Sequence, residues 1–449
     1  MPRISMRAKL RGMLASDPAL TNRLLRLLGG KRVERIAQRN AIRAAQHAFE
    51  HVPYYRSLYE AHGFDARRMK QLDWAGFLSL PVTSKAAVED VPDEDLLDSR
   101  LVFPRDDALI GLSSGTTRKP ATWPVGWDEF YTFRAVFHNA LRALAADRLP
   151  TEVVLIMGAE GIDLAGNIVY RAFFSLKEET RWPFELFLAG EDPADVCSLL
   201  KWLAKRDIHS LLIGTYPGTF ESILDKVAAD PEAHTVWTRF KRKKIFLGGQ
   251  LVAQPLRERI WSEMALADDA LTSLEILYIS SDSGQTIAHT TPFAAWLQRY
   301  LAERPALSDL LGLDPAHRTK SILEFVPSLS MYVEPNSAGT EGALLTTWKH
   351  RPLIRYASRD LVWTMPSRDV TRLLNKHAKG WRRDFKRSGY GRSFIPSNTL
   401  IGVVLGRADD IRIVNGANIS PDILRHALAC DLTRRRRATN LSRSRGRGV

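Results

Sequence analysis

ALIGLSSGTTRKP, residues 108–120, joins a short apolar run to a loop of small hydroxyl residues around one glycine. The apolar run predicts a strand. Backbone N–H groups and hydroxyls in such a loop can donate to phosphate oxygens, and a lysine adds positive charge. The residue order differs from that of a P-loop, and the same composition is also typical of an ordinary turn. The candidate phosphate ligands are Ser113, Ser114, Gly115, Thr116, Thr117 and Lys119.

Strands and helices alternate along the chain after this loop. Short, continuously apolar runs predict buried strands, and runs with a period near 3.6 predict the helices between them. The predicted strands are residues 152–158, 209–218, 243–250 and 273–281, and the predicted helices are 130–149, 196–208 and 255–266. This alternation predicts an α/β fold, with a large N-terminal domain of doubly wound, mostly parallel sheets over residues 1–405.

The flanks of that region have other patterns. Residues 1–60 predict a helical lead-in that Pro53 interrupts, and Ser84 predicts a helix cap. A β-rich subdomain follows residue 320, where 321–335 and 341–348 predict hairpin strands with GTEG as the turn. The remaining segments are a basic, helix-rich or mobile insert at 366–392 and a disordered Arg-rich tail at 431–449.

Composition excludes several classes of protein. The chain has 449 residues, 45% of them hydrophobic and 25% charged, which favours a folded globular protein over a disordered one. Two cysteines exclude a disulfide scaffold. No apolar run reaches the length of a membrane span, and arginines interrupt the apolar stretches near the start, so we expect neither a span nor a secretory signal. We expect a cytoplasmic protein.

The net charge of +14 is concentrated in three segments. Residues 1–50 carry +8, residues 366–392 carry +7 and residues 431–449 carry +6, which leaves the rest of the chain at about −7. Basic flanks of this kind are most often solvated, and contact with nucleic acid or an anionic membrane is the alternative. Nucleic acid is not the partner that we expect, because the charge avoids the presumed core.

Four further motifs follow the Ser/Thr/Gly loop in a fixed order, and together they carry a resemblance. They are GGQ at 248–250, YISSD at 278–282, RYASRDL at 355–361 and GRADD at 406–410. With the loop, they resemble the adenylate-forming (AMP-dependent synthetase/ligase) superfamily. The pattern is most similar to the phenylacetate–coenzyme A ligase family, which HVPYYRSLYEAHGFD at 51–65 and LPVTSKAAVED at 80–90 also resemble. The resemblance spans about residues 45–428.

The resemblance implies roles for individual residues. Thr116 and Lys119 of the loop would hold the ATP phosphates and act in catalysis with Arg407, and Asp282 would hold Mg²⁺. Asp360 would accept hydrogen bonds from the ribose hydroxyls. The rest of the nucleotide pocket would comprise Gly248, Gly249, Tyr278 and Ser281, and Asp409 would lie at the hinge.

The implied chemistry is physically reasonable. A carboxylate is a poor electrophile, because it is anionic and oxide is a very poor leaving group. Attack on the α-phosphorus of ATP makes that oxygen part of AMP, which leaves readily. Such chemistry needs positioning, a metal and positive charge near the phosphate oxygens. The implied activity is an AMP-forming acid–thiol ligase that activates an aromatic or other small organic acid to acyl-AMP and then forms a thioester with coenzyme A.

Several candidates also have structural interpretations. Asp282 and Asp360 could cap helices or turns, and Tyr278 could be an ordinary core aromatic rather than an adenine-stacking residue. The helix after the loop offers Tyr131 and His138 to an acyl pocket, although packing or solvent exposure explains them equally well. The turn after the second predicted strand offers Thr215 and Tyr216 to the same pocket.

The sequence also departs from the family pattern. Asp282 stands where the family usually has Glu, Gln250 removes a charge, and Arg359 replaces a glycine. The family has a C-terminal lid with a catalytic lysine, whereas only 42 residues follow Arg407 here and none of them is lysine, so we expect residues 406–430 to be a truncated remnant of that lid without its lysine. Loss of one preorganised charge typically costs about 10²–10³ in rate. The alternative is therefore a degenerate nucleotide- or acyl-binding protein without turnover. The identity of the acid and the oligomeric state stay open.

Overall fold

The computed structural model describes most of the chain between residues 18 and 419. The described residues are 18–99, 108–112, 122–126, 130, 134, 137, 153–157, 164–180, 184–208, 210–240, 242–249, 252, 254–263, 274–280, 285–313, 318, 320–325, 331–334, 342–349, 351–390, 395–408, 412–414 and 417–419. Every structural statement below concerns these residues.

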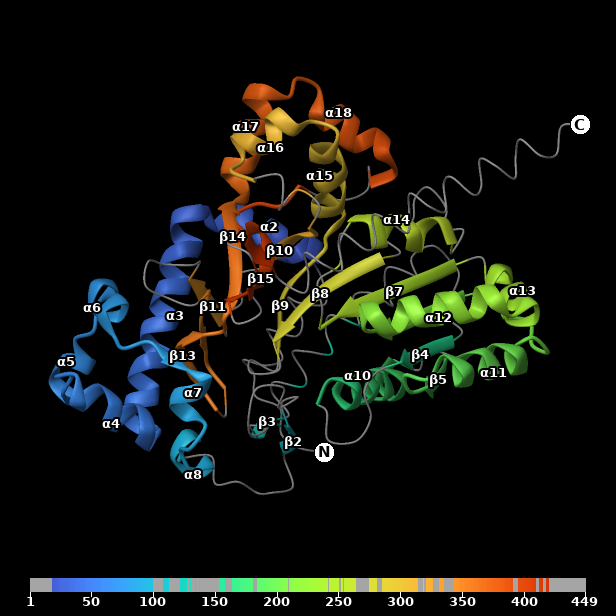
Figure 1. Ribbon diagram of the computed structural model, residues 1–449. Helices are drawn as coiled ribbons and strands as arrows, with labels where there is room; N and C mark the ends of the chain where they lie inside the picture. The colour runs from blue at the N-terminus through green and yellow to red at the C-terminus, as the bar shows by residue number, and fades with distance from the viewer. Residues whose placement is uncertain are drawn as a thin grey trace, which may run out of the picture.

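The N-terminal part is helical, as the sequence predicts (Figure 1). Its helices are α2(Pro18–Leu28), α3(Gly30–His51), α4(Pro53–Ala61), α5(Ala66–Lys70), α6(Trp74–Ser79), α7(Lys85–Val88) and α8(Asp93–Leu96). Pro53 begins α4 directly after the end of α3, because its ring cannot continue the preceding helix. The predicted cap at Ser84 is confirmed, since its hydroxyl accepts a hydrogen bond from the backbone N–H of Ala87.

A mixed sheet of nine strands forms the centre of the molecule. Its order is β14-β15-β10-β9-β8-β7-β6-β4-β5. The parallel half consists of β4(Val153–Met157), β5(Glu185–Leu188), β6(Ser210–Thr215), β7(Arg242–Gly248) and β8(Leu274–Ser280). The antiparallel half consists of β9(Gln285–His289), β10(Ile322–Phe325), β14(Asp360–Pro366) and β15(Leu400–Arg407). The predicted strands in the parallel half are confirmed.

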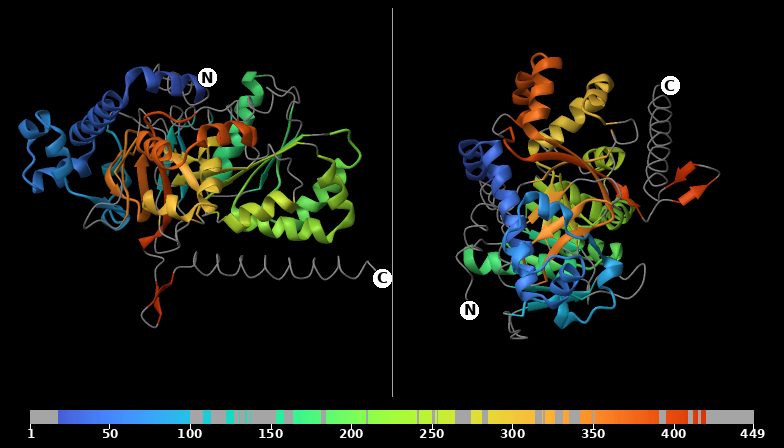
Figure 2. Two further views of the ribbon diagram at one scale, coloured as in Figure 1. Left: turned by 90° about the horizontal axis from the view of Figure 1, so that it is seen from above. Right: turned by 90° about the vertical axis from the view of Figure 1, so that its left-hand side faces the viewer.

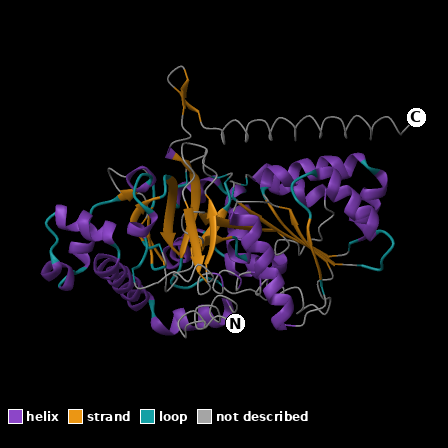
Figure 3. Cartoon of the chain, turned by 90° about the horizontal axis from the view of Figure 1, so that it is seen from below, coloured by secondary structure: helices purple, strands orange, loops and turns teal. Residues whose placement is uncertain are grey.

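Helices cover both faces of the parallel half, which is the doubly wound arrangement (Figure 3). On one face, α11(Pro193–Leu203), α12(Pro217–Ala229) and α13(Pro231–Arg239) pack over Leu211, Ile213 and Ile245. On the other, α10(Leu164–Thr180) packs over Val154, Leu212 and Phe246 together with Phe137, whose ring centroid is 5.5 Å from that of Phe246. α14(Gln254–Glu263) follows β7, as predicted.

A smaller sheet has the order β1-β13-β12-β11. It contains β1(Thr83–Ser84), β11(Met331–Glu334), β12(Leu344–Thr347) and β13(Leu353–Ala357). The expectation that residues 321–335 form one hairpin unit is wrong for its first half. β10 joins the large sheet between β9 and β15, and only β11 pairs with β12. This position buries β10 in the core between α15(Pro292–Ala302) and β15.

Arg355 joins the helical N-terminal part to this smaller sheet. Its guanidinium forms an ion pair with Glu334 and donates to the carbonyl oxygens of Leu78 and Leu80. The Tyr55 hydroxyl adds to the junction, since it accepts from the N–H of Ile354 at 3.0 Å. Buried charge pairs need such full hydrogen bonding to offset desolvation.

The basic segment after β14 is helical and well packed. It contains α17(Ser367–His377), α18(Trp381–Phe385) and the π-helical turn η2(Lys386–Tyr390), with α16(Pro305–Leu310) nearby. Trp381 and Phe385 pack against Phe293 and Trp296 of α15. Two short hairpins complete the description, β2(Ala108–Leu112) with β3(Thr122–Gly126) and β16(Arg412–Val414) with β17(Ala417–Ile419). No described helix is both long and apolar enough to cross a membrane.

Candidate active site

The carboxyl ends of three neighbouring parallel strands bring together candidates from three separate motifs. Thr215 ends β6 and Tyr216 follows it, Gly248 ends β7 and Gly249 follows it, and Tyr278 lies near the end of β8. The registers pair Thr215 with Leu247 and Gly248 with Leu277, so these ends lie along one edge of the sheet. In open α/β sheets, ligands bind at this edge.

Gly249 lets an aromatic ring lie directly against the backbone. It adopts φ +76°, a left-handed conformation that favours glycine, and a Cβ built on it would stand 2.6 Å from the ring of Tyr216. Gly248 has no such constraint, since the nearest atom to a Cβ there is 3.6 Å away. Steric contact with the Tyr216 ring therefore explains why the second residue of the GG pair, just after β7, is glycine.

Tyr278 and Asp360 are in direct contact although 82 residues separate them in the sequence. The Tyr278 hydroxyl donates to Oδ2 of Asp360 at 2.5 Å, and the tyrosine ring packs edge-on against Phe325. Burial, followed by the negative charge of Asp360, raises the pKa of Tyr278 well above its ordinary value. The tyrosine therefore stays a hydrogen-bond donor that fixes the orientation of the carboxylate.

Arg407 stands beside the same carboxylate. Asp360 and Arg407 are paired residues at the ends of β14 and β15, and Nη1 of Arg407 lies 3.9 Å from Oδ1 of Asp360. The Arg407 side chain is 47% exposed and that of Asp360 only 13%. The contact is therefore loose, and the guanidinium can reach other anionic groups at this end of the sheet.

The backbone around Asp360 is fixed by neighbours whose contacts the sequence did not predict. The Ser358 hydroxyl accepts from the N–H of Asp360 and donates to the carbonyl oxygen of Ala343. A Cβ on Gly342, which has φ +111°, would stand within 2.8 Å of the Asp360 backbone. Arg359 has φ +62°, so the arginine adopts the left-handed conformation that glycine favours. In the sequence, the GTEG turn that ends at Gly342 was the only indication of this glycine. Its contact with Asp360 depends on the pairing of distant strands and could not be predicted.

Thr215 offers a hydroxyl at the end of β6. The residue is buried, and its Oγ1 forms no hydrogen bond to another described residue. A buried polar atom without a partner costs free energy and is usually satisfied by a water or a ligand. The neighbouring Tyr216 is half-buried at the same strand end.

The remaining candidates lie outside the described residues. They are Ser113, Ser114, Gly115, Thr116, Thr117, Lys119, Tyr131, His138, Ser281, Asp282 and Asp409. The first six belong to the segment between the paired strands β2 and β3, and Tyr131 and His138 flank the buried, helical Phe137. Within the described part of the chain, no group of three His, Cys, Asp or Glu side chains could hold a metal ion.

Sequence comparison gives no relative, whereas structural comparison does. No protein-family model and no curated protein matches the chain. Its structure is similar to that of 2-hydroxyisobutyryl-CoA ligase in complex with 2-HIB-AMP and CoA, with a TM-score of 0.54 and 16% identity over 87% of this chain and 71% of that one. Fatty acyl-adenylate ligases from E. coli and L. pneumophila give a TM-score of 0.40 and 12% identity, over 76% of this chain and 60% of that one.

The first of these similarities is strong enough to define the fold. The chain has the fold of an adenylate-forming ligase, and the predicted α/β fold class is confirmed. At 16% identity the similarity extends to the fold and no further. Function has to be argued from the residues at the edge of the sheet.

Proposed function

We propose that this protein activates a carboxylic acid with ATP to an acyl-AMP and pyrophosphate, and then transfers the acyl group to the thiol of coenzyme A. The observation that carries the proposal is the contact between Tyr278 and Asp360 beside Arg407. The Asp360 carboxylate is oriented by Tyr278, and the half-exposed Arg407 guanidinium lies beside it; this supports a nucleotide site at the edge where α/β folds bind ligands. The fold supports the same reaction class.

The described residues fit a nucleotide. Asp360 can accept hydrogen bonds from a ribose diol, since its carboxylate is held by Tyr278 and only partly exposed. Gly248 and Gly249 lack side chains and would let a base come close to the backbone, beside the Tyr216 ring that packs against the second glycine. Arg407 can follow the phosphate charge as it develops.

The other roles rest on the sequence. In the proposed site, the loop residues Ser113, Ser114, Gly115, Thr116 and Thr117 and the ammonium of Lys119 hold the ATP phosphates, and Thr116 and Lys119 act in catalysis with Arg407. Mg²⁺ commonly uses one or two carboxylates together with substrate phosphates, which suits Asp282 and would neutralise phosphate charge. Ser281 adjoins that ligand, and Asp409 belongs to the hinge. An aromatic or small organic acid would occupy a pocket bordered by Tyr131, His138, Thr215 and Tyr216.

Two bond exchanges make up the proposed reaction. An oxygen of the acid attacks the α-phosphorus of ATP, and the bond from that phosphorus to the bridging oxygen breaks to release pyrophosphate. The coenzyme A thiolate then attacks the acyl carbon, and AMP leaves with the electron pair of the broken C–O bond. The likeness to the phenylacetate–coenzyme A ligase family belongs to this proposal, as does the choice of acceptor.

Pyrophosphate release from ATP, Mg²⁺ and a panel of aromatic and short-chain acids tests the proposal. Asp360→Asn should lower kcat/KM for ATP about tenfold to a hundredfold, because a hydrogen bond to a charged group is lost. Asp309→Asn, at an exposed carboxylate on α16, is the matched control and should leave the rate unchanged. If calorimetry shows that ATP binds but no acid gives pyrophosphate release, the proposed reaction is wrong and the protein only binds nucleotides.

A further inference from the structure

Helix α2 exposes a row of leucines. Leu20, Leu24, Leu27 and Leu28 recur at the spacing that places side chains on one helical face. The exposed fractions of the last three are 38%, 76% and 37%. Large apolar side chains exposed in one row, unlike scattered single ones, mark a surface that contacts something apolar.

The opposite side of α2 is attached to the body of the protein. Arg26, across the helix from the leucine row, donates from Nη2 to the carbonyl oxygen of Ile395 at 3.1 Å. The amide of Asn398 donates to the carbonyl oxygen of Leu25 at 2.7 Å. These bonds hold α2 in place and leave the leucine row facing outward.

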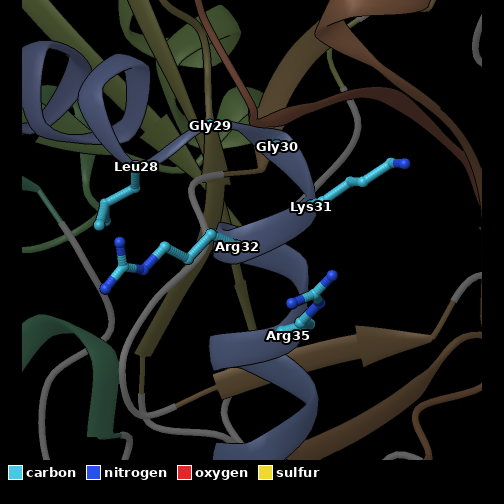
Figure 4. Close-up of a pocket in the computed structure, with 6 residues that line it drawn as sticks. All are labelled: Leu28, Gly29, Gly30, Lys31, Arg32 and Arg35. Atoms are coloured by element: carbon cyan, nitrogen blue, oxygen red, sulfur yellow. The ribbon is translucent and has the colours of Figure 1, made fainter.

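Cations surround the leucine row. The bend between α2 and α3 borders an open depression of about 540 Å³ lined by Leu28, Gly29, Gly30, Lys31, Arg32 and Arg35 (Figure 4). The arginine side chain of residue 32 projects to the same side as Leu28, whereas Lys31 points the other way. The only acid in the sequence between residues 18 and 49 is Glu34.

Tertiary structure adds the second basic segment to the same place. A Cβ built on Gly30 would stand 2.8 Å from Nη1 of Arg368, at the start of α17. Residues 18–50 and 366–390, both basic in sequence, therefore meet at the α2–α3 bend. Figure 2 shows α2 and α3 on the outside of the molecule, beside the strand that leads into α17. We call Leu24, Leu27, Leu28, Arg32 and Arg368 the α2 patch.

We propose that the α2 patch docks this protein on the surface of a bilayer that contains anionic phospholipids. A helix with an apolar row and a rim of Lys and Arg lies in the plane of the lipid interface, with its leucines among the acyl chains and its cations at the headgroups. Nucleic acid would satisfy the cations but would leave the leucines in water. The combination of both features favours lipid.

Co-sedimentation of the full-length chain with lipid vesicles tests this. The protein should sediment with phosphatidylcholine vesicles that contain phosphatidylserine, far less with phosphatidylcholine alone, and less at high salt because added ions screen the cations. Equal sedimentation with both vesicle types, or none with either, would overturn the proposal.

Two pairs of variants separate the apolar contribution from the electrostatic one. Leu27→Ser should weaken vesicle binding about tenfold, whereas Leu310→Ser, at another exposed leucine, should not change it. Arg32→Gln should weaken binding about fivefold, whereas Lys226→Gln, at an exposed lysine on α12, should not. Far-UV circular dichroism checks that each variant is folded.

The nucleic-acid alternative predicts another pattern. It predicts that duplex DNA binds the protein as strongly as the vesicles do, that Leu27→Ser changes neither interaction, and that Arg32→Gln abolishes both. That pattern would show a purely electrostatic surface, and the lipid proposal would be wrong.

Discussion

The Tyr278 hydroxyl and the Asp360 carboxylate meet at 2.5 Å, and this contact joins the parallel and antiparallel halves of the large sheet at one end. The tyrosine comes from β8 and the aspartate from the outermost strand β14. In the sheet, β9, β10 and β15 lie between these two strands, so the contact is made across the end of the sheet rather than between adjacent strands.

Removal of this hydrogen bond is the first prediction. Tyr278→Phe keeps the ring against Phe325 but leaves the Asp360 carboxylate without its donor, so the free energy of unfolding should fall by about 1.5–3 kcal/mol. Tyr59→Phe is the control, because the Tyr59 hydroxyl is buried and has no hydrogen-bond partner among the described residues. Urea denaturation should show no loss for that control, and equal losses for both variants would contradict the assigned role.

The second prediction concerns Gly249. Gly249→Ala adds a Cβ at a position with φ +76° and forces it against the Tyr216 ring, so it should destabilise the fold and displace that ring. Gly312→Ala is a matched control. Gly312 has φ +75°, but the nearest atom to a Cβ built on it, Nε1 of Trp363, is 3.6 Å away. Thermal unfolding should show a larger loss for Gly249→Ala, and ATP titration should show weaker binding for that variant alone.

The third prediction concerns the left-handed backbone of Arg359. An alanine there keeps the strain of φ +62°, whereas a glycine removes it, so Arg359→Gly should be more stable than Arg359→Ala by about 1 kcal/mol. Both variants lose the same side chain, which isolates the effect of the backbone. Chemical denaturation of the two variants measures the difference. If alanine proved as stable as glycine, φ at this residue would have to be negative.

A buried network of charges leads to the fourth prediction. Glu275 lies between Lys244, at 3.1 Å, and Nδ1 of His289, at 2.8 Å. Burial acts to raise the pKa of Glu275, but the attraction of Lys244 and His289 outweighs it and lowers that pKa to about 2. Burial likewise acts to lower the pKa of His289, and its bond to Glu275 reverses this and raises the pKa above the ordinary 6.5.

The two shifts act at opposite ends of the pH range. The Glu275 contribution to stability is present above its ordinary pKa of 4.5 and is lost as pH falls toward about 2. The His289 contribution is present below 6.5 and is lost as pH rises through its raised pKa. Together they should stabilise the fold most between 4.5 and 6.5.

Urea denaturation at pH values below, within and above that range checks the network. Glu275→Gln should cost about 3–5 kcal/mol near pH 5.5, because it leaves Lys244 buried without its charge partner. His289→Gln should remove the loss of stability on the alkaline side. If stability fell equally at alkaline pH in the wild-type protein and in His289→Gln, groups other than His289 would be responsible for the fall.

Local patterns made the central strands and helices predictable. The strands β4, β6, β7 and β8 are short apolar runs between helical runs. Each run is mainly apolar because the strand is buried on both faces, so its own residues suffice to predict it. The position of β10 was not predictable in the same way. Its sequence, ILEF, suits either sheet, and the choice depends on packing against α15 and β15, which lie far away in the chain.

The candidate site shows the same division between local and distant signals. Tyr278, Asp360 and Arg407 were recognisable from their motifs, because each motif is a contiguous run. Gly342 and Ser358 also belong to runs that the sequence singles out, but their role in fixing the backbone of Asp360 was not recognisable from those runs. Their importance arises from the close approach of two backbone segments.

By itself, the sequence determined the order of elements, the composition of the Ser/Thr/Gly loop and the three basic segments, because periodicity, residue type and charge are properties of contiguous residues. Only the tertiary structure decided that Tyr278 donates to Asp360 and that the N-terminal basic segment meets Arg368 at Gly30. These pairs are more than 80 residues apart, and no local preference specifies which distant side chains a closed core brings together.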